Sequence, residues 1–210
     1  DRDWSSDVCS SDLLFDVPAT AAHCVWIEGE DYRILKEKGV TVAVNPVSNM
    51  KLASGVCDVK ALQGHQISTA IGTDSVASNN SLNFLEEMKM FALAGKVHFA
   101  DPTRVTPQDA IRAATRNGAL SQGRTDCGIL REGSRADLIV LDTAQPNMAL
   151  VHNMMNNIVY SADPSNIVMT MVDGKVLYEN GEYSTIDVEK AVAMVEKATG
   201  RILSELVKDK

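Results

Sequence analysis

Residues 70–80 read AIGTDSVASNN, and this stretch decides the fold. It closes an apolar segment, QISTAIGT at 66–73, with a single carboxylate, Asp74, and then enters a loop of Ser and Asn. A short apolar run bounded by such turn signals predicts a buried strand. The carboxylate at its end is either a helix cap or turn residue, or a group held at the mouth of a pocket. The position of Asp74 in the sequence, taken alone, favours its interpretation as a helix cap or turn residue.

Strands and helices alternate outward from this stretch. Buried strands are predicted at 19–25, 40–44 and 66–73, with helices at 29–39, 58–63, 81–96 and 106–118 and a loop at 47–57. Strands that are apolar throughout and alternate with helices imply a parallel sheet covered by helices, so the fold class is α/β. Three strands are few for a complete domain of this class.

Local signals predict where the longer helices begin and end. Asn80 or Ser81 is the expected cap of the helix at 81–96, because both side chains can accept a hydrogen bond from the first turn. In the next helix, Thr106 and Asp109 have the spacing of a capping box, and Gly118 is the expected last residue.

The sequence pattern changes after residue 120. Short strands are predicted at 136–142, 157–161 and 166–183, and Asp173-Gly174 between two apolar runs is a strong hairpin signal. A helix begins near Asp187, and we expect its apolar stripe to pack against the rest of the protein: Val188, Val192, Val195, Ala198, Ile202 and Leu206. The expected parts are an α/β domain at 14–119, a β region at 120–183 and a terminal helix at 184–210.

The first thirteen residues, DRDWSSDVCSSDL, match nothing that follows them. They are polar and aperiodic, and they look like translated sequencing-adaptor sequence joined to a broken reading frame. We therefore expect residues 1–13 to be non-native, to pack against nothing, and to stand where the natural protein continues upstream. The alternative is a disordered acidic tail.

Composition excludes several classes of function. The net charge of the 210 residues is −8 and the sequence pI is about 5.0, without a Lys/Arg-rich run, which argues against nucleic acid as a partner. No apolar run approaches the ~20 residues that span a bilayer, and no secretory signal is evident. The cysteines show no CxxC pairing, so we expect reduced thiols in a cytoplasmic protein and no zinc ribbon: Cys9, Cys24, Cys57 and Cys127.

Three polar residues end the predicted parallel strands. His23 follows the first strand, Asn45 the second and Asp74 the third, and sites in such sheets form beyond these carboxyl ends. A His and an Asp facing one cavity can bind a divalent metal or handle the proton of a water. The other histidines add no HxH or HExxH pattern: His65, His98 and His152. Spacing therefore leaves both the structural and the catalytic interpretation open.

Several separated motifs, in order, resemble the amidohydrolase superfamily. They are AAHCVWIEGEDYRILKEKGVTVAVNPVSNMKLASG at 21–55, IGTDSVASNN at 71–80, AIRAATRNGAL at 110–120, GILREGSRADLIVLD at 128–142 and VDGKVLYENGEY at 172–183. The similarity covers residues 14–183. The closest branch is that of methylthioadenosine/S-adenosylhomocysteine deaminases and s-triazine chlorohydrolases.

The resemblance implies the C-terminal part of a TIM-type (β/α)8 barrel and of a small β-sandwich. The strands within 14–119 would be the last three of the barrel, and 120–183 the C-terminal share of the sandwich. Asp74 would be a metal ligand and proton shuttle, and His23 a second catalytic residue that contacts water or substrate. Asn45, Ser48 and Asn49 would shape the substrate pocket. The ligands from earlier strands and the catalytic acid are absent from this chain.

This family binds one divalent metal, so zinc, with iron as the second choice, is the expected cofactor. The implied parent hydrolyses C–N bonds of a small N-heterocyclic substrate, most simply by adenosine-type deamination, and homo-oligomers are common in the family. The alternatives are chlorohydrolase-type removal of another leaving group and a non-catalytic fragment. Two departures leave the shape of the substrate open, namely GTDS where GTDG is commoner and Cys57-Asp58 where Ala-Pro is usual.

Overall fold

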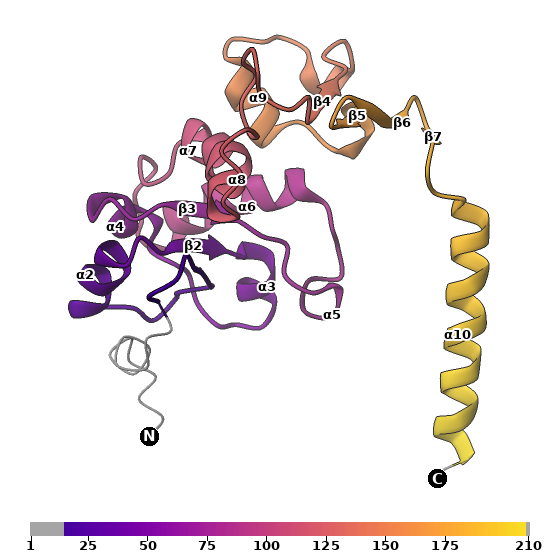
Figure 1. Ribbon diagram of the computed structural model, residues 1–210, viewed down its shortest axis with the longest axis horizontal. Helices are drawn as coiled ribbons and strands as arrows, with labels where there is room; N and C mark the ends of the chain where they lie inside the picture. Colours follow the sequence, from indigo (N-terminus) through magenta and orange to yellow (C-terminus); the bar gives the residue numbers. More distant parts are fainter. Residues whose placement is uncertain (1–14, 209–210) are drawn as a thin grey trace. The chain divides into compact units, whose positions relative to one another are not determined.

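The computed structural model describes residues 15–208, so the expectation for residues 1–13 lies outside the described part. The chain divides into two compact units, which we describe separately (Figure 1). The first contains residues 15–135 together with residues 143–166. The second contains residues 136–142 and the chain from Ile167 onward.

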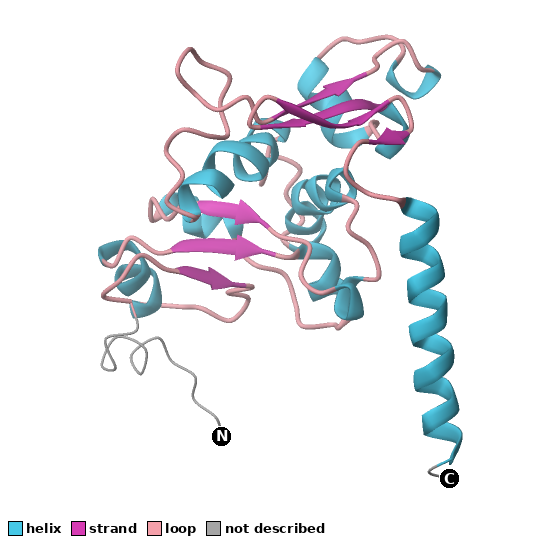
Figure 2. Cartoon of the chain, turned by 45° about the vertical axis from the view of Figure 1, so that its right-hand side comes forward, coloured by secondary structure: helices cyan, strands magenta, loops and turns pink. Residues whose placement is uncertain are grey.

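The first unit is built on the expected parallel sheet. Its strands are β1 (Thr20–Ala22), β2 (Thr41–Val44) and β3 (Thr69–Ile71), in the order β1-β2-β3. The central strand β2 is buried, and Val42 has no exposed surface. Figure 2 shows the strands running in one direction with helices packed around them. Mixed strands and helices in this order confirm the α/β class.

Helices follow each strand of the sheet. They are α2 (Glu30–Glu37), α3 (Pro46–Lys51), α4 (Val59–Gly64), α5 (Val76–Asn79), α6 (Phe84–His98), α7 (Pro107–Arg112), the π-helical turn η1 (Ala113–Asn117) and α8 (Gly118–Ser121). Contacts with β3 come from α4, α6, η1 and α8. The predicted loop at 47–57 was wrong over its first part, because α3 occupies Pro46–Lys51. A proline at the first helical position suits a helix start, and the carboxylate of Glu87 accepts from Val47 N in this first turn.

Two expected helix ends were wrong. Asn83 caps α6 by accepting from the backbone N–H of Glu86 at 3.3 Å. Asn80 instead ends α5 in the left-handed region, and the Ser81 hydroxyl accepts from Asn83 N. Gly118 continues the helix in right-handed conformation, because the chain passes through η1 into α8.

The capping box of α7 is confirmed by hydrogen bonds in both directions. Thr106 Oγ1 accepts from Asp109 N at 3.2 Å, and the Asp109 carboxylate accepts from Thr106 N at 2.9 Å. Farther along, Asn117 donates from Nδ2 to the carbonyl of Thr69 at 2.9 Å. This bond ties the end of η1 to the start of β3.

The predicted strand at 157–161 was also wrong. Residues Met154–Tyr160 form α9, which lies in the first unit between the 3₁₀ helices η2 (Pro146–Met148) and η3 (Pro164–Asn166). Asn153 caps α9 by accepting from the backbone N–H groups of Met155 and Asn156. The helix buries Val159 almost completely, so tertiary packing overrides the β propensity of its Ile-Val-Tyr run.

The second unit is an antiparallel sheet followed by a long helix. Its strands, in spatial order, are β4 (Leu138–Leu141), β5 (Ile167–Val172), β6 (Lys175–Glu179) and β7 (Glu182–Tyr183). Asp173 and Gly174 both have positive φ, 51° and 76°, which confirms the expected hairpin turn.

The terminal helix α10 (Val188–Lys208) begins where the sequence predicts. The expected packing of its stripe was wrong, because the side chains remain exposed, including Val192 at 52% and Leu206 at 58%. No helix among residues 15–208 is both long and apolar enough to cross a membrane.

Candidate active site

The carboxyl ends of the three parallel strands meet at one edge of the sheet. His23 follows β1, Asn45 follows β2, and Asp74 lies three residues beyond β3. Backbone bonds continue the ladder past the strands, since His23 N donates to Ala43 O at 2.8 Å and Gly72 N to Val44 O at 2.9 Å. His23 and Asp74 have φ of 69° and 58°, a region that non-glycine residues rarely occupy. Such strain concentrates at functional sites.

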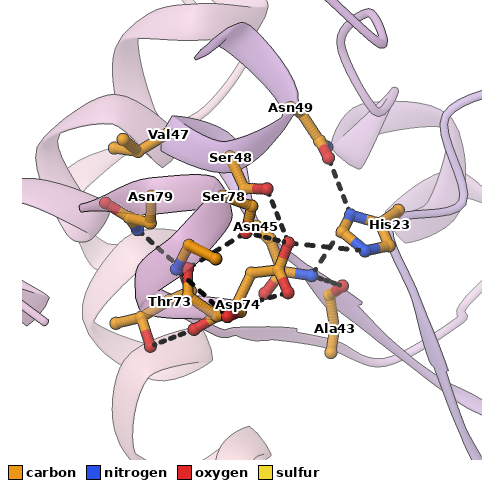
Figure 3. Close-up of polar contacts among 12 residues, drawn as sticks. His23, Ala43, Asn45, Val47, Ser48, Asn49, Thr73, Asp74, Ser78 and Asn79 are labelled. Atoms are coloured by element: carbon orange, nitrogen blue, oxygen red, sulfur yellow. Dashed lines mark hydrogen bonds and ion pairs between the residues drawn. The ribbon is translucent and has the colours of Figure 1, made fainter. Parts of the chain in front are cut away.

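Three donors hold the Asp74 carboxylate (Figure 3). Oδ2 accepts from Ser48 Oγ at 2.5 Å and from Ser78 Oγ at 2.8 Å, and Oδ1 accepts from Ser75 N at 2.7 Å. These hydrogen bonds, with that of Ser48 the largest contribution, lower the pKa of Asp74 from 3.8 to about 2. The group is therefore ionised at neutral pH and positioned from both α3 and the turn into α5.

The imidazole of His23 faces the same carboxylate. Its Nε2 lies 3.9 Å from Asp74 Oδ2, while Nδ1 lies 2.7 Å from Asn49 Oδ1 and 3.4 Å from Asn45 Nδ2. The shorter contact is to a carbonyl oxygen, so Nδ1 carries the hydrogen and donates to Asn49. A neutral His23 then has a free lone pair on Nε2. A water lying between the ring and Asp74 could donate one hydrogen to Nε2 and the other to the Asp74 carboxylate.

The side chains of His23 and Asp74 line one open cavity of about 370 Å³, as expected. Its walls are formed by His23, Cys24, Val25, Trp26, Ser48, Asn49, Leu52, Ser54 and Asp74. We call Asp74, Ser48, His23 and Asn49 the polar end, and Val25, Trp26 and Leu52 the apolar rim. Asn45 is buried behind the polar end, where it donates to the carbonyl of Ala43 at 3.3 Å.

Cys24 lines the cavity but is poorly suited to act as a nucleophile. Burial raises the pKa of its thiol to about 11, and burial likewise raises that of Cys57 to about 12. Cys24 and Cys57 are free thiols, in line with the expectation for these positions, and Cys9 lies outside the described residues.

The donor set fits one part of a metal site but does not complete one. Within residues 15–208, no group of three or more His, Cys, Asp or Glu side chains is placed to hold a metal ion. Asp74 supplies an ionised carboxylate and His23 one ring nitrogen, whereas catalytic zinc takes three protein ligands. Asp74 therefore has the chemistry of a single ligand.

Sequence reasoning missed a buried carboxylate behind the site. Glu87 on α6 is 1% exposed, and its Oε2 accepts from Val47 N in the first turn of α3 at 3.3 Å. Asn79 donates from Nδ2 both to Glu87 Oε1 and to the carbonyl of Thr73, the latter at 2.6 Å. Desolvation raises the pKa of Glu87.

Glu87 thus connects the segment that presents Ser48 to the turn that presents Asp74. A signal for this role was available in the sequence, because Glu87 precedes Phe91 by four residues on the apolar side of α6. An acid at such a position predicts a buried partner.

Comparison with known proteins identifies relatives over most of the chain. The profile of the Amidohydrolase family matches residues 5–177. A 5-methylthioadenosine/S-adenosylhomocysteine deaminase of Dictyoglomus thermophilum is 42% identical over 192 residues, 91% of this chain and 45% of the relative. A 5'-deoxyadenosine deaminase of Methanosarcina mazei is 37% identical over 203 residues, 94% of this chain and 47% of the relative.

Solved structures share the fold. An adenosine deaminase from Xanthomonas campestris with bound zinc superposes with a TM-score of 0.85 at 31% identity, covering 88% of this chain and 42% of that one. Atrazine chlorohydrolase TrzN from Arthrobacter aurescens, complexed with zinc, superposes with a TM-score of 0.80 at 26% identity, covering 85% and 40%. This chain spans less than half the length of each of these proteins.

Proposed function

Because this chain belongs to the amidohydrolase family, we propose that its parent is a metal-dependent hydrolase acting on C–N bonds of an N-heterocycle. The relatives named as deaminases and as a chlorohydrolase confirm the resemblance read from the sequence. Adenosine-type deamination, of methylthioadenosine or S-adenosylhomocysteine, is the specific reaction we propose.

We also propose how the chain contributes to the parent. Residues 14–119 would supply the last three strands of a (β/α)8 barrel, 120–183 a share of a β-sandwich, and 184–210 a terminal helix. Residues 1–13 would be foreign to the natural protein, although the family profile begins to match at residue 5. Among the described residues the parallel sheet has three strands and ends at β1 and β3, which supports this assignment because a closed barrel leaves no free edge.

The observation that carries the proposal is the pairing of an ionised Asp74 with His23 in one cavity at the carboxyl edge of a parallel sheet. We assign Asp74 as one ligand of a divalent metal, zinc first and iron second, with the other ligands outside this chain. A bound metal of this kind lowers the pKa of a water from 15.7 to about 7. Zinc in two of the similar structures supports that assignment.

The residues present divide the proton chemistry between them. Asp74 would accept the proton of the attacking water at its carboxylate and pass it to the leaving nitrogen. His23 in its neutral form would accept a hydrogen bond from that water at Nε2, because Asn49 already takes the Nδ1 hydrogen. Asn45, Ser48 and Asn49 would hold these two groups and shape the substrate pocket.

Two other functions compete with deamination. The likeness to TrzN favours a chlorohydrolase, since both reactions replace a ring substituent with a hydroxyl. Identity to the deaminases is higher, at 37–42% against 26%, and we therefore place deamination first. The incomplete donor set favours a chain that is inactive alone.

The test compares the full-length parent with the 210-residue chain. Ammonia release is measured on 5'-methylthioadenosine, S-adenosylhomocysteine, 5'-deoxyadenosine and adenosine, chloride release on atrazine, and bound zinc and iron by elemental analysis. We expect the parent to release ammonia, and Asp74→Asn to lower its turnover by at least about 10²–10⁴-fold. His23→Ala should retain more metal than Asp74→Asn. A full-length Asp74→Asn enzyme with a near-normal rate, or an isolated chain with stoichiometric metal and turnover, would contradict the proposal.

A further inference from the structure

An exposed tryptophan stands beside the proposed catalytic groups. Trp26 follows His23 by three residues, lines the same cavity as Asp74, and is 84% exposed. Large aromatic side chains are usually well buried, because each can remove a large apolar surface from water. An indole left open at the wall of a polar cavity is therefore an available contact for a ligand.

The backbone around Trp26 holds the ring at the cavity wall. Gly55, in the loop after α3, has a φ of +116°, and a Cβ added there would lie 2.7 Å from Val25 Cγ1 and 3.5 Å from Trp26 Cζ2. The missing side chain lets this loop lie directly against both residues. Leu52, which is 59% exposed, extends the same apolar rim. One part of the cavity is thus polar and ionised, and another is apolar.

This division sets what a substrate should look like. The reacting carbon must lie near Asp74, among groups that donate and accept protons. A substituent that reaches the apolar rim gains by removing apolar surface from water, whereas a hydroxyl placed there loses water and finds no side-chain partner on Val25 or Leu52.

We infer that Trp26, supported by Leu52, is a specificity-determining residue that contacts an apolar substituent of the substrate and favours it over a hydroxyl. The inference rests on the proposed deaminase function and adds the part of the substrate that is selected. A thioether or alkyl group attached to the nucleoside away from the reacting ring carbon has the required chemistry. Relatives named for 5-methylthioadenosine and 5'-deoxyadenosine act on nucleosides of this kind.

The experiment measures a ratio rather than a rate. For the full-length parent, kcat/KM is determined for 5'-methylthioadenosine and for adenosine, in the wild type and in Trp26→Ala, Trp26→Phe and Val97→Ala. In Trp26→Ala, kcat/KM should fall for both substrates. The ratio of kcat/KM for 5'-methylthioadenosine to that for adenosine should fall about tenfold or more, which is the discrimination that one apolar group in a pocket supplies. Trp26→Phe should keep most of the preference. Val97 is equally exposed, at 82%, lies outside the cavity wall, and should leave the ratio unchanged.

A binding measurement separates this inference from the proposed function. Calorimetric titration with the deaminated products, 5'-methylthioinosine and inosine, needs no turnover. We expect Trp26→Ala to weaken binding of 5'-methylthioinosine about tenfold more than binding of inosine. If the wild type deaminates nucleosides but neither ratio moves by more than twofold in Trp26→Ala, the role of Trp26 is refuted and the function stands. If the wild type turns over no nucleoside, the function fails, and an unchanged product ratio would refute the role of Trp26 as well.

Discussion

Glu87 should be essential for the stability of the site although it lies outside the cavity. Its carboxylate accepts from Val47 N and from Asn79 Nδ2, and Asn79 also donates to the Thr73 carbonyl, next to Asp74. Glu87→Ala leaves both donors buried without their acceptor. At about 1–3 kcal/mol for each unsatisfied group, the loss is roughly 2–6 kcal/mol. Removing a desolvated carboxylate offsets part of this, so we expect the free energy of unfolding to fall by about 2–4 kcal/mol.

Glu87→Gln should lower the free energy of unfolding by less than Glu87→Ala, and the group left without a partner should be the Thr73 carbonyl. Its amide oxygen can still accept from Val47 N, but its NH2 group would face the Asn79 donor. Asn79 can respond by rotating its amide, because its Oδ1 is buried without a partner and can accept from the new NH2. The Thr73 carbonyl then loses its donor, which leaves one unsatisfied group and a loss of about 1–3 kcal/mol. The turn that presents Asp74 is loosened, so turnover should fall while KM changes less.

The assay is urea unfolding of the full-length parent, followed by circular dichroism, together with kcat and KM for each variant. Glu86→Gln is the matched control, since Glu86 is the exposed neighbour on α6 and loses the same charge. It should change stability by no more than about 0.5 kcal/mol. If Glu87→Ala is as stable as this control, the buried network does not hold the two segments together. Because the pKa of Glu87 is raised in the folded protein, its contribution to wild-type stability is lost as pH rises above 4.5 through the folded-state pKa. Glu87→Gln should lack this pH dependence of stability.

Three further predictions concern the same unit. The pKa of Asp74 is lowered from 3.8 to about 2, so its contribution to stability is present above pH 3.8 and is lost as pH falls toward 2. Ser78→Ala removes one of its donors and should raise that pKa, which carbon-detected NMR titration of the carboxyl would measure; an unchanged value would mean that Ser78 is not a real partner. Gly128 has a φ of +72°, and an added Cβ would lie 2.7 Å from the backbone oxygen of Thr115. Gly128→Ala should therefore destabilise the protein by about 2 kcal/mol or more, and a melting temperature within a degree of wild type would refute the contact.

Local patterns were sufficient to predict the frame of the candidate site. The apolar runs at 40–44 and 66–73 alternate with helical segments, and that alternation requires a parallel sheet whose strand ends share one edge. The positions of His23 and Asp74 at those ends follow from chain order alone. The capping box at Thr106 and the turn at Asp173-Gly174 were equally predictable, because each depends on residues fewer than five positions apart.

The errors arose where distant residues decide the outcome. Helix α3 was read as a loop because its first turn depends partly on Glu87, forty positions away. The run at 157–161 was read as a strand because its burial within the first unit is invisible to local propensity.

The sequence by itself determined the α/β class, the edge at which the site forms and the two residues that face each other there. Only the tertiary structure decided which donors hold Asp74, which ring nitrogen of His23 faces it, and that Trp26 remains open at the wall. It also showed that the stripe of α10 stays exposed, although the sequence predicted the helix itself correctly. Helices, turns and strand order follow from neighbouring residues, whereas hydrogen-bond partners and burial depend on atoms that folding brings together from across the chain.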